Sequence, residues 1–227
     1  MTAQNGTEDA PRTKICVFCG SAGGNNPAYL EAARTLGKAL AEKNIDLVYG
    51  GGTVGLMGEV AKTVCAINGP KSVHGIIPAA LAKFERDDTY QDVNANNLFI
   101  PETSKYGHTT VVDDMHTRKR LMAEEVLNGG PGSGFIVLPG GYGTMEELFE
   151  VVTWNQLGIH DRGVCLLNIE GYWDGILSWI ETSGKEGFVR SANKDIIVTA
   201  SDAEGAIAAL QDYKVSEGTY KLDWKKQ

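Results

Sequence analysis

Short runs of apolar residues, most of them β-branched, recur along the chain, and glycine or proline often follows them directly. Runs of this length, bounded by residues that favour turns, predict buried β-strands. The predicted strands are Ile15–Cys19, Ile45–Tyr49, Val73–Ile77, Leu98–Pro101, Phe135–Leu138, Val164–Ile169 and Ile196–Thr199.

Longer segments between these strands carry apolar residues at the spacing of an α-helix. In the first of them Tyr29, Leu30, Ala33 and Leu36 share one face, and Pro27 suits a first helical turn. The predicted helices are one that starts at Pro27, then Val54–Ile67, Val111–Leu127, Met145–Leu157, a helix around Trp173–Gly187, and Asp202–Asp212.

Strands that alternate with helices of this length indicate a parallel sheet covered on both faces. Since the crossovers between parallel strands are right-handed, the sequence predicts an α/β fold with a doubly wound, mostly parallel, Rossmann-like sheet. We expect one domain over residues 13–213, preceded by a disordered segment at 1–12 and followed by a tail at 214–227.

Composition and charge narrow the classes of partner. Of the 227 residues, 42% are hydrophobic and 22% charged, and the net charge is −8. Nucleic acids and anionic membranes select basic surfaces, so we expect neither as a partner. The sequence has no apolar stretch of membrane-spanning length and no leader before Lys14, which predicts a cytoplasmic protein.

Cys16 and Cys19 form a C-x-x-C pattern that occurs in redox and metal sites. Both lie in a predicted buried strand, where residues three apart face opposite sides. No second Cys or His pair stands at zinc-like spacing. The sequence therefore predicts buried, inert thiols and no metal.

Three glycine-rich segments follow predicted strands: Gly20–Gly24, Gly50–Gly58 and Gly140–Gly143. Ligands of parallel α/β sheets bind beyond the carboxyl ends of the strands, and the helix N-termini there attract anions. None of the segments has a Walker lysine or the G-x-G-x-x-G spacing. A mononucleotide phosphate is therefore a simpler ligand than a dinucleotide.

Each of the two remaining motifs has a structural alternative. Residues Thr144 to Glu147 fit a capping box that would only start a helix. The segment His116–Arg120 contains Arg118, which suits phosphate. It would instead be a solvated helix face if its basic residues pair with Glu124 and Glu125.

The segment Pro139–Glu147 resembles the P-G-G-x-G-T-x-x-E motif of the Lonely-guy (LOG) family, the cytokinin riboside 5′-monophosphate phosphoribohydrolases that are often labelled lysine decarboxylases. Met115–Lys119 resembles the family's second motif, M-H-x-R-K. The resemblance extends from about Lys14 to Asp212, with insertions near residues 82–111 and 128–133, the second of which we expect to reshape the edge of the pocket.

This resemblance implies that Arg118 and Glu147 are the catalytic pair. It also implies a pocket for substrate and phosphate lined by Ser21, Gly51, Gly52, Met57, Glu85, Lys119, Gly140, Gly141, Tyr142, Gly143, Thr144, Glu146 and Thr153. It implies a homodimer or a larger homo-oligomer that needs no cofactor.

The expected reaction is hydrolysis of the N-glycosidic bond of N6-modified adenosine 5′-monophosphates, and of AMP itself as a further candidate. The products would be the free base and ribose 5-phosphate, with Glu147 stabilising the cationic sugar and orienting water. A non-catalytic nucleotide carrier or sensor on the same fold is the alternative. Lysine decarboxylation is disfavoured because no lysine at a strand end suits a pyridoxal Schiff base.

Overall fold

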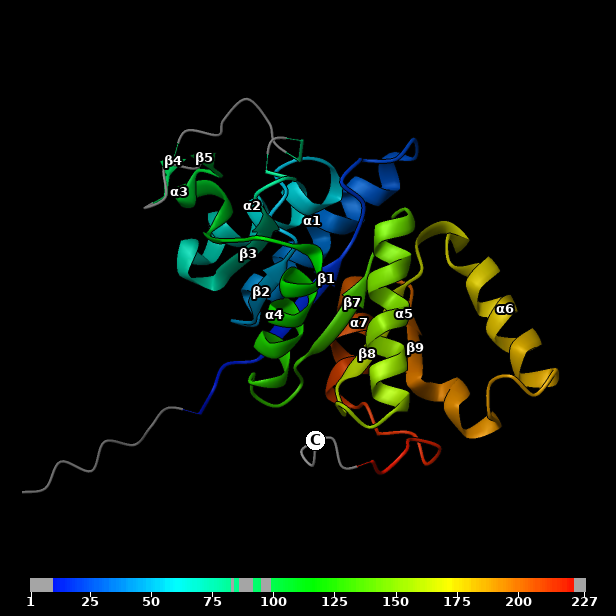
Figure 1. The fold of residues 1–227 in the computed structure, drawn as a ribbon. Coiled ribbons are helices and arrows are strands. Elements are labelled where there is room, and N and C mark those ends of the chain that lie inside the picture. The colour runs from blue at the N-terminus through cyan, green and yellow to red at the C-terminus, as the bar shows by residue number, and fades with distance from the viewer. Residues whose placement is uncertain (1–9, 83, 86–91, 95–98, 223–227) are drawn as a thin grey trace, which may run out of the picture.

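The computed structural model describes residues 10–82, 84–85, 92–94 and 99–222. Its main sheet is entirely parallel, with the strand order β6-β3-β2-β1-β7-β8-β9 (Figure 1). These strands are β1 (Lys14–Phe18), β2 (Asp46–Tyr49), β3 (Val73–Pro78), β6 (His108–Val112), β7 (Gly134–Val137), β8 (Gly163–Leu167) and β9 (Ile197–Ala200). The predicted doubly wound α/β fold is confirmed.

Helices cover both faces of the sheet (Figure 1). One face carries α1 (Pro27–Glu42), α2 (Gly55–Asn68), α3 (Thr103–Tyr106) and α7 (Ala203–Gln211). The other carries α4 (Met115–Leu127), α5 (Tyr142–Gln156) and α6 (Asp174–Lys185). The short elements are the 3-10 segments η1 (Pro70–Ser72), η2 (Ile169–Gly171) and η3 (Ser191–Ile196) and the antiparallel pair β4 (Asp92–Val93) and β5 (Phe99–Ile100).

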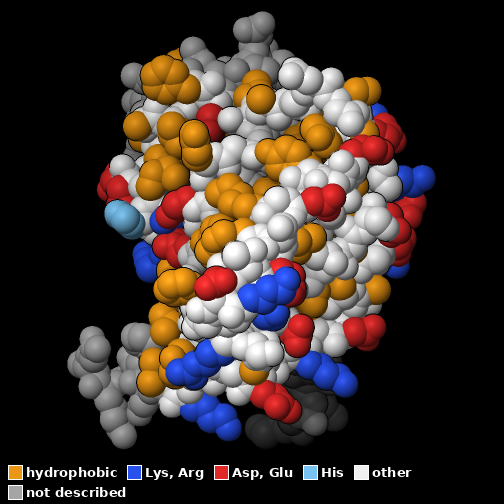
Figure 2. Space-filling view, turned by 90° about the vertical axis from the view of Figure 1, so that its right-hand side faces the viewer, with side chains coloured by type: hydrophobic (Ala, Val, Ile, Leu, Met, Phe, Trp, Pro, Cys, Tyr) orange, Lys and Arg blue, Asp and Glu red, His pale blue; other side chains and the backbone are white. Residues whose placement is uncertain are grey.

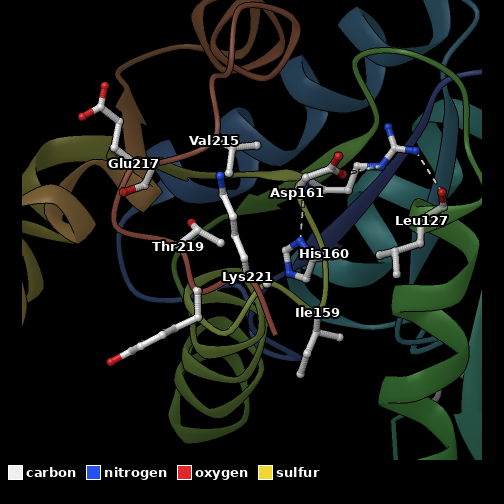
Figure 3. Close-up of a pocket in the computed structure, with 12 residues that line it drawn as sticks. Leu127, Ile159, His160, Asp161, Val215, Glu217, Thr219 and Lys221 are labelled. Carbon is white, nitrogen blue, oxygen red and sulfur yellow. Dashed lines mark hydrogen bonds and ion pairs between the residues drawn. The ribbon is translucent and has the colours of Figure 1, made fainter. Parts of the chain in front are cut away.

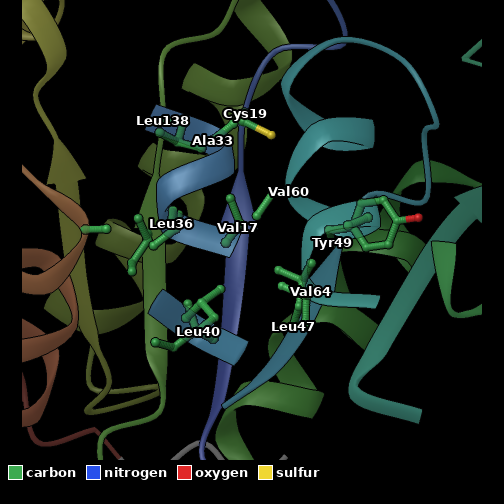
Figure 4. Close-up of a cluster of buried hydrophobic side chains, with 14 of the residues drawn as sticks. Val17, Cys19, Ala33, Leu36, Leu40, Leu47, Tyr49, Val60, Val64 and Leu138 are labelled. Carbon is green, nitrogen blue, oxygen red and sulfur yellow. The ribbon is translucent and has the colours of Figure 1, made fainter. Parts of the chain in front are cut away.

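The central strand β1 contributes to the cores on both sides of the sheet. Val17 packs with Leu36 of α1 and Val60 of α2 in the first core (Figure 4). Cys19 belongs to that core as well, whereas Cys16 faces the second core under α4 and α5. Both thiols are free and buried, and burial raises their pKa values. The prediction of buried thiols on opposite faces is confirmed.

The order of strands reverses beside β1, and this reversal places the site. The chain builds outward from β1 through β2 and β3 on one side, then returns to add β7, β8 and β9 on the other. Backbone hydrogen bonds join the ends of the two central strands, from Gly20 N to Pro139 O and from Leu138 N to Phe18 O, both 3.0 Å. A crevice at such a reversal is the usual ligand site of this architecture.

The predicted helix Val111–Leu127 was wrong at its start. Val111 and Val112 end strand β6, which pairs in parallel with β3. Helix α4 starts at Met115, where the Asp114 carboxylate caps it by accepting from Thr117 N at 2.9 Å. The β-branched run favours an extended backbone, and this preference outweighed the apolar periodicity. Among the helices described, none has the length and apolar character that a bilayer span requires.

Candidate active site

A cavity of about 260 Å³ lies at the carboxyl edge of the sheet, where β1, β2, α2, α4 and α5 meet. It brings together nine of the residues predicted for the site: Ser21, Met57, Glu85, Arg118, Gly141, Tyr142, Gly143, Thr144 and Glu147. Gly140 lines an adjacent cavity of about 340 Å³, which shares Gly20, Ser21 and Gly141 with the first.

Helix α5 presents an unfilled N-terminus to this cavity. Its N-cap is Gly141, which has no side chain to cap the first turn. Within the part of the chain that the structure describes, no backbone acceptor faces the N–H groups of Tyr142, Gly143 and Thr144. Three such groups at the positive end of a helix form a seat for an anion. The capping-box interpretation was wrong, because Thr144 lies inside the helix rather than before it.

The other two glycine-rich turns are already occupied by the protein itself. At α2, the N–H groups of Leu56 and Met57 both point at the carbonyl of Gly20, at 3.1 and 3.4 Å. At α1, the Asn26 side chain accepts from Ala28 N at 3.0 Å. The expectation that all three turns offer phosphate sites is therefore corrected: of the three, the turn at α5 remains open.

The turn before α2 forms part of the wall of the site. Gly55 has a φ of +60°, and a Cβ there would lie 2.4 Å from the Ser21 carbonyl carbon, so the two turns touch backbone to backbone. Gly51 packs against Ile77, and Gly52 lies beside Met57 and Glu85. Gly51 and Gly52 therefore support the wall of the cavity without lining it.

Arg118 projects from α4 into the cavity and is only 5% exposed. One Nη2 hydrogen bond, of 2.9 Å, reaches Gly50 O, and the same nitrogen lies 3.9 Å from Glu85 Oε2. Arg118 Nε and Glu85 Oε2 are buried without a hydrogen-bond partner among the described residues. Unsatisfied polar atoms are costly in a core, so their presence here indicates a site prepared for a polar ligand.

The solvated-face interpretation of this helix holds for Arg120 alone, which pairs with Glu124 at 2.6 Å. Glu125, the other expected acidic partner, instead binds Lys14 and His74. Lys119 is buried and bridges α4 to α5 through Glu146 and Glu150.

Glu147 lies one turn beyond the open end of α5 and is 8% exposed. Burial raises the pKa of its carboxyl to about 7, although the charge of Arg118 opposes this shift and Glu146 and Glu85 reinforce it. A carboxyl with a pKa near neutrality can exchange a proton with water or substrate at physiological pH. The arrangement can therefore combine anion binding with acid–base or charge-stabilising chemistry.

Besides Gly51, Gly52 and Gly140, three predicted pocket residues do not line the cavity: Lys119, Glu146 and Thr153. The Lys119 ammonium and the Glu146 carboxylate are bound to each other, and neither residue lines the cavity. Thr153 is exposed on the second half of α5. In this chain Lys119 links the helices that carry Arg118 and Glu147.

The comparisons with known proteins agree on one family. Residues 57–210 match the family described as possible lysine decarboxylase. The chain is 46% identical over 200 residues to cytokinin riboside 5′-monophosphate phosphoribohydrolase LOG1 of Arabidopsis thaliana, covering 88% of this chain and 83% of LOG1. The chain belongs to the LOG family. Arabidopsis LOG7 is 44% identical over 213 residues, which are 93% of this chain and 88% of LOG7.

A fungal relative is similar over a larger share of the chain. The bifunctional cytokinin biosynthesis protein of Fusarium pseudograminearum is 50% identical over 217 residues, or 96% of this chain, which spans only 43% of that relative. Among solved structures, the molybdenum cofactor binding protein of Rippkaea orientalis covers 88% of this chain and 96% of its own, with a TM-score of 0.58 and 20% identity. This likeness shows the shared fold.

The LOG-family cavity also contains residues that the sequence analysis did not predict for the site. These are Val17, Cys19, Met115 and Met122, whereas Gly20 and Gly50, which also line the cavity, belong to the glycine-rich segments expected at a ligand site. Helical spacing could have identified the two methionines. Met115 stands three residues before Arg118 and Met122 four residues after it, so both share its face of the helix. Met115 also contacts the guanidinium, with its sulfur 3.7 Å from Nη1.

A larger cavity of about 800 Å³ lies at the opposite edge of the sheet, between the C-terminal tail and the loop before β8 (Figure 3). Its one histidine, His160, is fully engaged: Nε2 bonds to Val151 O at 2.8 Å and Nδ1 accepts from Arg162 N at 3.1 Å. The 128–133 loop lies at this edge too, tied by Arg162 to Leu127 O and Gly129 O. The expectation that this loop reshapes the edge of the predicted pocket was therefore wrong.

Proposed function

We propose that this LOG-family protein hydrolyses the N-glycosidic bond of N6-modified adenosine 5′-monophosphates and releases a free cytokinin base and ribose 5-phosphate. The observation that carries the proposal is the placement of the Glu147 carboxyl one turn from the unfilled N-terminus of α5, with the Arg118 guanidinium in the same cavity. Relatives that share 46% and 44% of their residues with this chain are named for this activity.

In the proposed mechanism the first turn of α5 holds the 5′-phosphate. Binding energy from this remote group fixes the ribose against Glu147 without weakening the reacting bond directly. As the bond from C1′ to the base nitrogen lengthens, positive charge develops on the sugar and negative charge on the base. The Glu147 carboxylate stabilises the sugar cation and accepts a proton from the water that attacks C1′.

Arg118 acts by charge rather than by proton transfer. A guanidinium stays ionised at every physiological pH, so it is a poor acid but a good electrostatic partner for an anion. Its Nε is buried and free of any described partner, which leaves a donor for substrate. The departing base takes its proton from water, because Glu147 must be ionised to stabilise the sugar cation.

The homo-oligomer expected for this family also belongs to the proposal. The side of the molecule that carries α6 displays hydrophobic side chains between charged ones (Figure 2). Exposed aromatic residues on or beside α5 and α6 include Tyr142, Trp179 and Phe188. Burial of such side chains in a contact between copies would be favourable. Light scattering coupled to size-exclusion chromatography tests this, and a monomer at micromolar concentration contradicts it.

We further place the protein in the cytoplasm, because the cysteines Cys16, Cys19, Cys65 and Cys165 are all free thiols. Localisation of a tagged full-length chain by fluorescence microscopy tests this placement.

The activity is tested by incubating the protein with N6-isopentenyl-AMP, AMP and the matching nucleosides, followed by chromatography. We expect free base and ribose 5-phosphate in equal amounts from a monophosphate and no release from a nucleoside. Glu147→Gln should bind the nucleotide and release almost no base, whereas the exposed-site control Glu124→Gln should behave as wild type. Nucleotide binding without any release would favour a carrier.

A further inference from the structure

Tyr172 contacts the glycine turn of α5 from outside the cavity that holds Arg118 and Glu147. It follows η2, beyond the end of β8, and its hydroxyl donates a hydrogen bond of 2.5 Å to the carbonyl oxygen of Gly140. Its ring lines the adjacent cavity of about 340 Å³.

The ring of Tyr172 is held in place by other aromatic side chains. It packs edge-on against Trp173, with ring centres 4.8 Å apart, and against Tyr29, at 5.6 Å. Trp173 is 1% exposed, and its indole nitrogen donates to Val137 O at 3.3 Å. The hydroxyl of Tyr172 is thereby fixed relative to the end of β7, the strand that leads into the glycine turn.

A hydrogen bond at Gly140 O controls more than one atom. In a planar trans peptide the C=O and N–H point in opposite directions, so the position of Gly140 O sets the direction of the Gly141 N–H. The preceding peptide is already fixed, because Gly20 N donates to Pro139 O at 3.0 Å. The glycines themselves restrict rotation very little. Tyr172 therefore holds the second of two consecutive peptides that lead into α5.

We propose that Tyr172 is a positioning residue for phosphate binding. Its hydroxyl holds the Gly140–Gly141 peptide in the orientation in which Gly141 and the first turn of α5 direct their N–H groups at a phosphate. This inference rests on the proposed function, because it takes the 5′-phosphate as the anion bound there. Tyr172 contacts no reacting atom, so its loss should weaken substrate and transition state equally, raising KM with little change in kcat.

The test compares Tyr172→Phe with Tyr29→Phe. Tyr29→Phe is the matched control, because it removes a hydroxyl from a residue that lines the same cavity but keeps the ring that packs against Tyr172. In each variant one measures kcat and KM for N6-isopentenyl-AMP, and inhibition constants for ribose 5-phosphate and for the unphosphorylated riboside. Loss of one hydrogen bond predicts that KM and the ribose 5-phosphate constant rise about three- to tenfold in Tyr172→Phe. We expect kcat and the inhibition constant of the riboside to stay within about twofold of the wild-type values. The control variant should match wild type in all four constants.

Two results for Tyr172→Phe would overturn the inference. One is an unchanged KM. The other is an equal loss of affinity for the riboside and for ribose 5-phosphate, which would indicate general disruption of the site. Thermal unfolding of each variant identifies such disruption. Failure of the proposed function is a separate result, since it means that wild type releases no base. In that case, calorimetric measurement of ribose 5-phosphate affinity still tests the role of Tyr172. If wild type does not bind ribose 5-phosphate at all, both the proposed function and the role of Tyr172 are contradicted.

Discussion

Burial of the Glu147 carboxyl makes the stability of this protein depend on pH in a direction opposite to that of an ordinary paired carboxylate. Its pKa is about 7 in the folded protein, against 4.5 for an unperturbed glutamate. Between these values the folded state binds more protons than the unfolded state, so the free energy of unfolding falls as pH rises from about 4.5 to 7. Above pH 7 the full cost of burying the charge is present.

The size of this effect follows from the pKa values. Raising the pKa from 4.5 to about 7 corresponds to about 3 kcal/mol. Attraction to Arg118 is already included, because it acts on the same pKa. Glu147→Gln removes the ionisable group and keeps the shape. Its free energy of unfolding, relative to that of wild type, should therefore be about 2.5 kcal/mol higher at pH 8 than at pH 5, because part of the effect is already present at pH 5. For a chain of this size that is roughly 5–10 °C in Tm.

The assay is thermal unfolding of wild type, Glu147→Gln and Glu124→Gln at pH 5 and pH 8. Comparing the two pH values isolates ionisation, because any neutral interaction that the glutamine side chain fails to make is missing at both. Glu124 is half-exposed in a surface ion pair, so its variant should differ from wild type by less than about 1 kcal/mol at either pH. The reasoning would be refuted if Glu147→Gln raised the stability by the same amount at both pH values, or raised it at neither.

Three further predictions follow from contacts in the core and the cavity. Glu85→Gln removes a charge that raises the pKa of Glu147. In a pH–rate profile, the rise of kcat/KM with pH near 7 should therefore move to lower pH. A rise that stays in place would contradict the influence of Glu85 on the pKa of Glu147. A Cβ on Gly50 would lie 1.9 Å from Arg118 Nη2, so Gly50→Ala should lower kcat/KM at least about tenfold, while Arg120→Ala at the exposed pair should leave it unchanged. Leu36→Ala opens a cavity at a fully buried position and should cost about 2–5 kcal/mol in urea unfolding; a loss below 1 kcal/mol would place Leu36 outside the core.

The fold could be predicted from the sequence because its strands are short apolar runs that end at glycine or proline. Ile45–Tyr49 and Phe135–Leu138 were found within one residue, since burial on both faces requires continuous apolar residues. Strand β6 was missed because it lies at the edge of the sheet and mixes His108 and Thr109 with apolar residues. Helix α5 starts three residues earlier than predicted, because Gly141 and not Thr144 is its N-cap.

The site was predicted less completely, for reasons that depend on distant contacts. Gly20 O fills the α2 terminus from the loop after β1, and no local pattern in the sequence encodes that contact. The direction of the Lys119 side chain depends on Glu146 and Glu150, on a different helix. The resemblance to the family's two motifs singled out Arg118 and Glu147, and these two residues line one cavity because α4 and α5 flank the same central strands.

The most direct test of the account is a structure of the Glu147→Gln variant with N6-isopentenyl-AMP bound, since this variant should hold the nucleotide without cleaving it. We expect the phosphate on the N–H groups of Tyr142, Gly143 and Thr144, and the side chain of residue 147 within about 4 Å of C1′. A phosphate seated elsewhere, or a residue 147 side chain far from the ribose, would contradict the central claim.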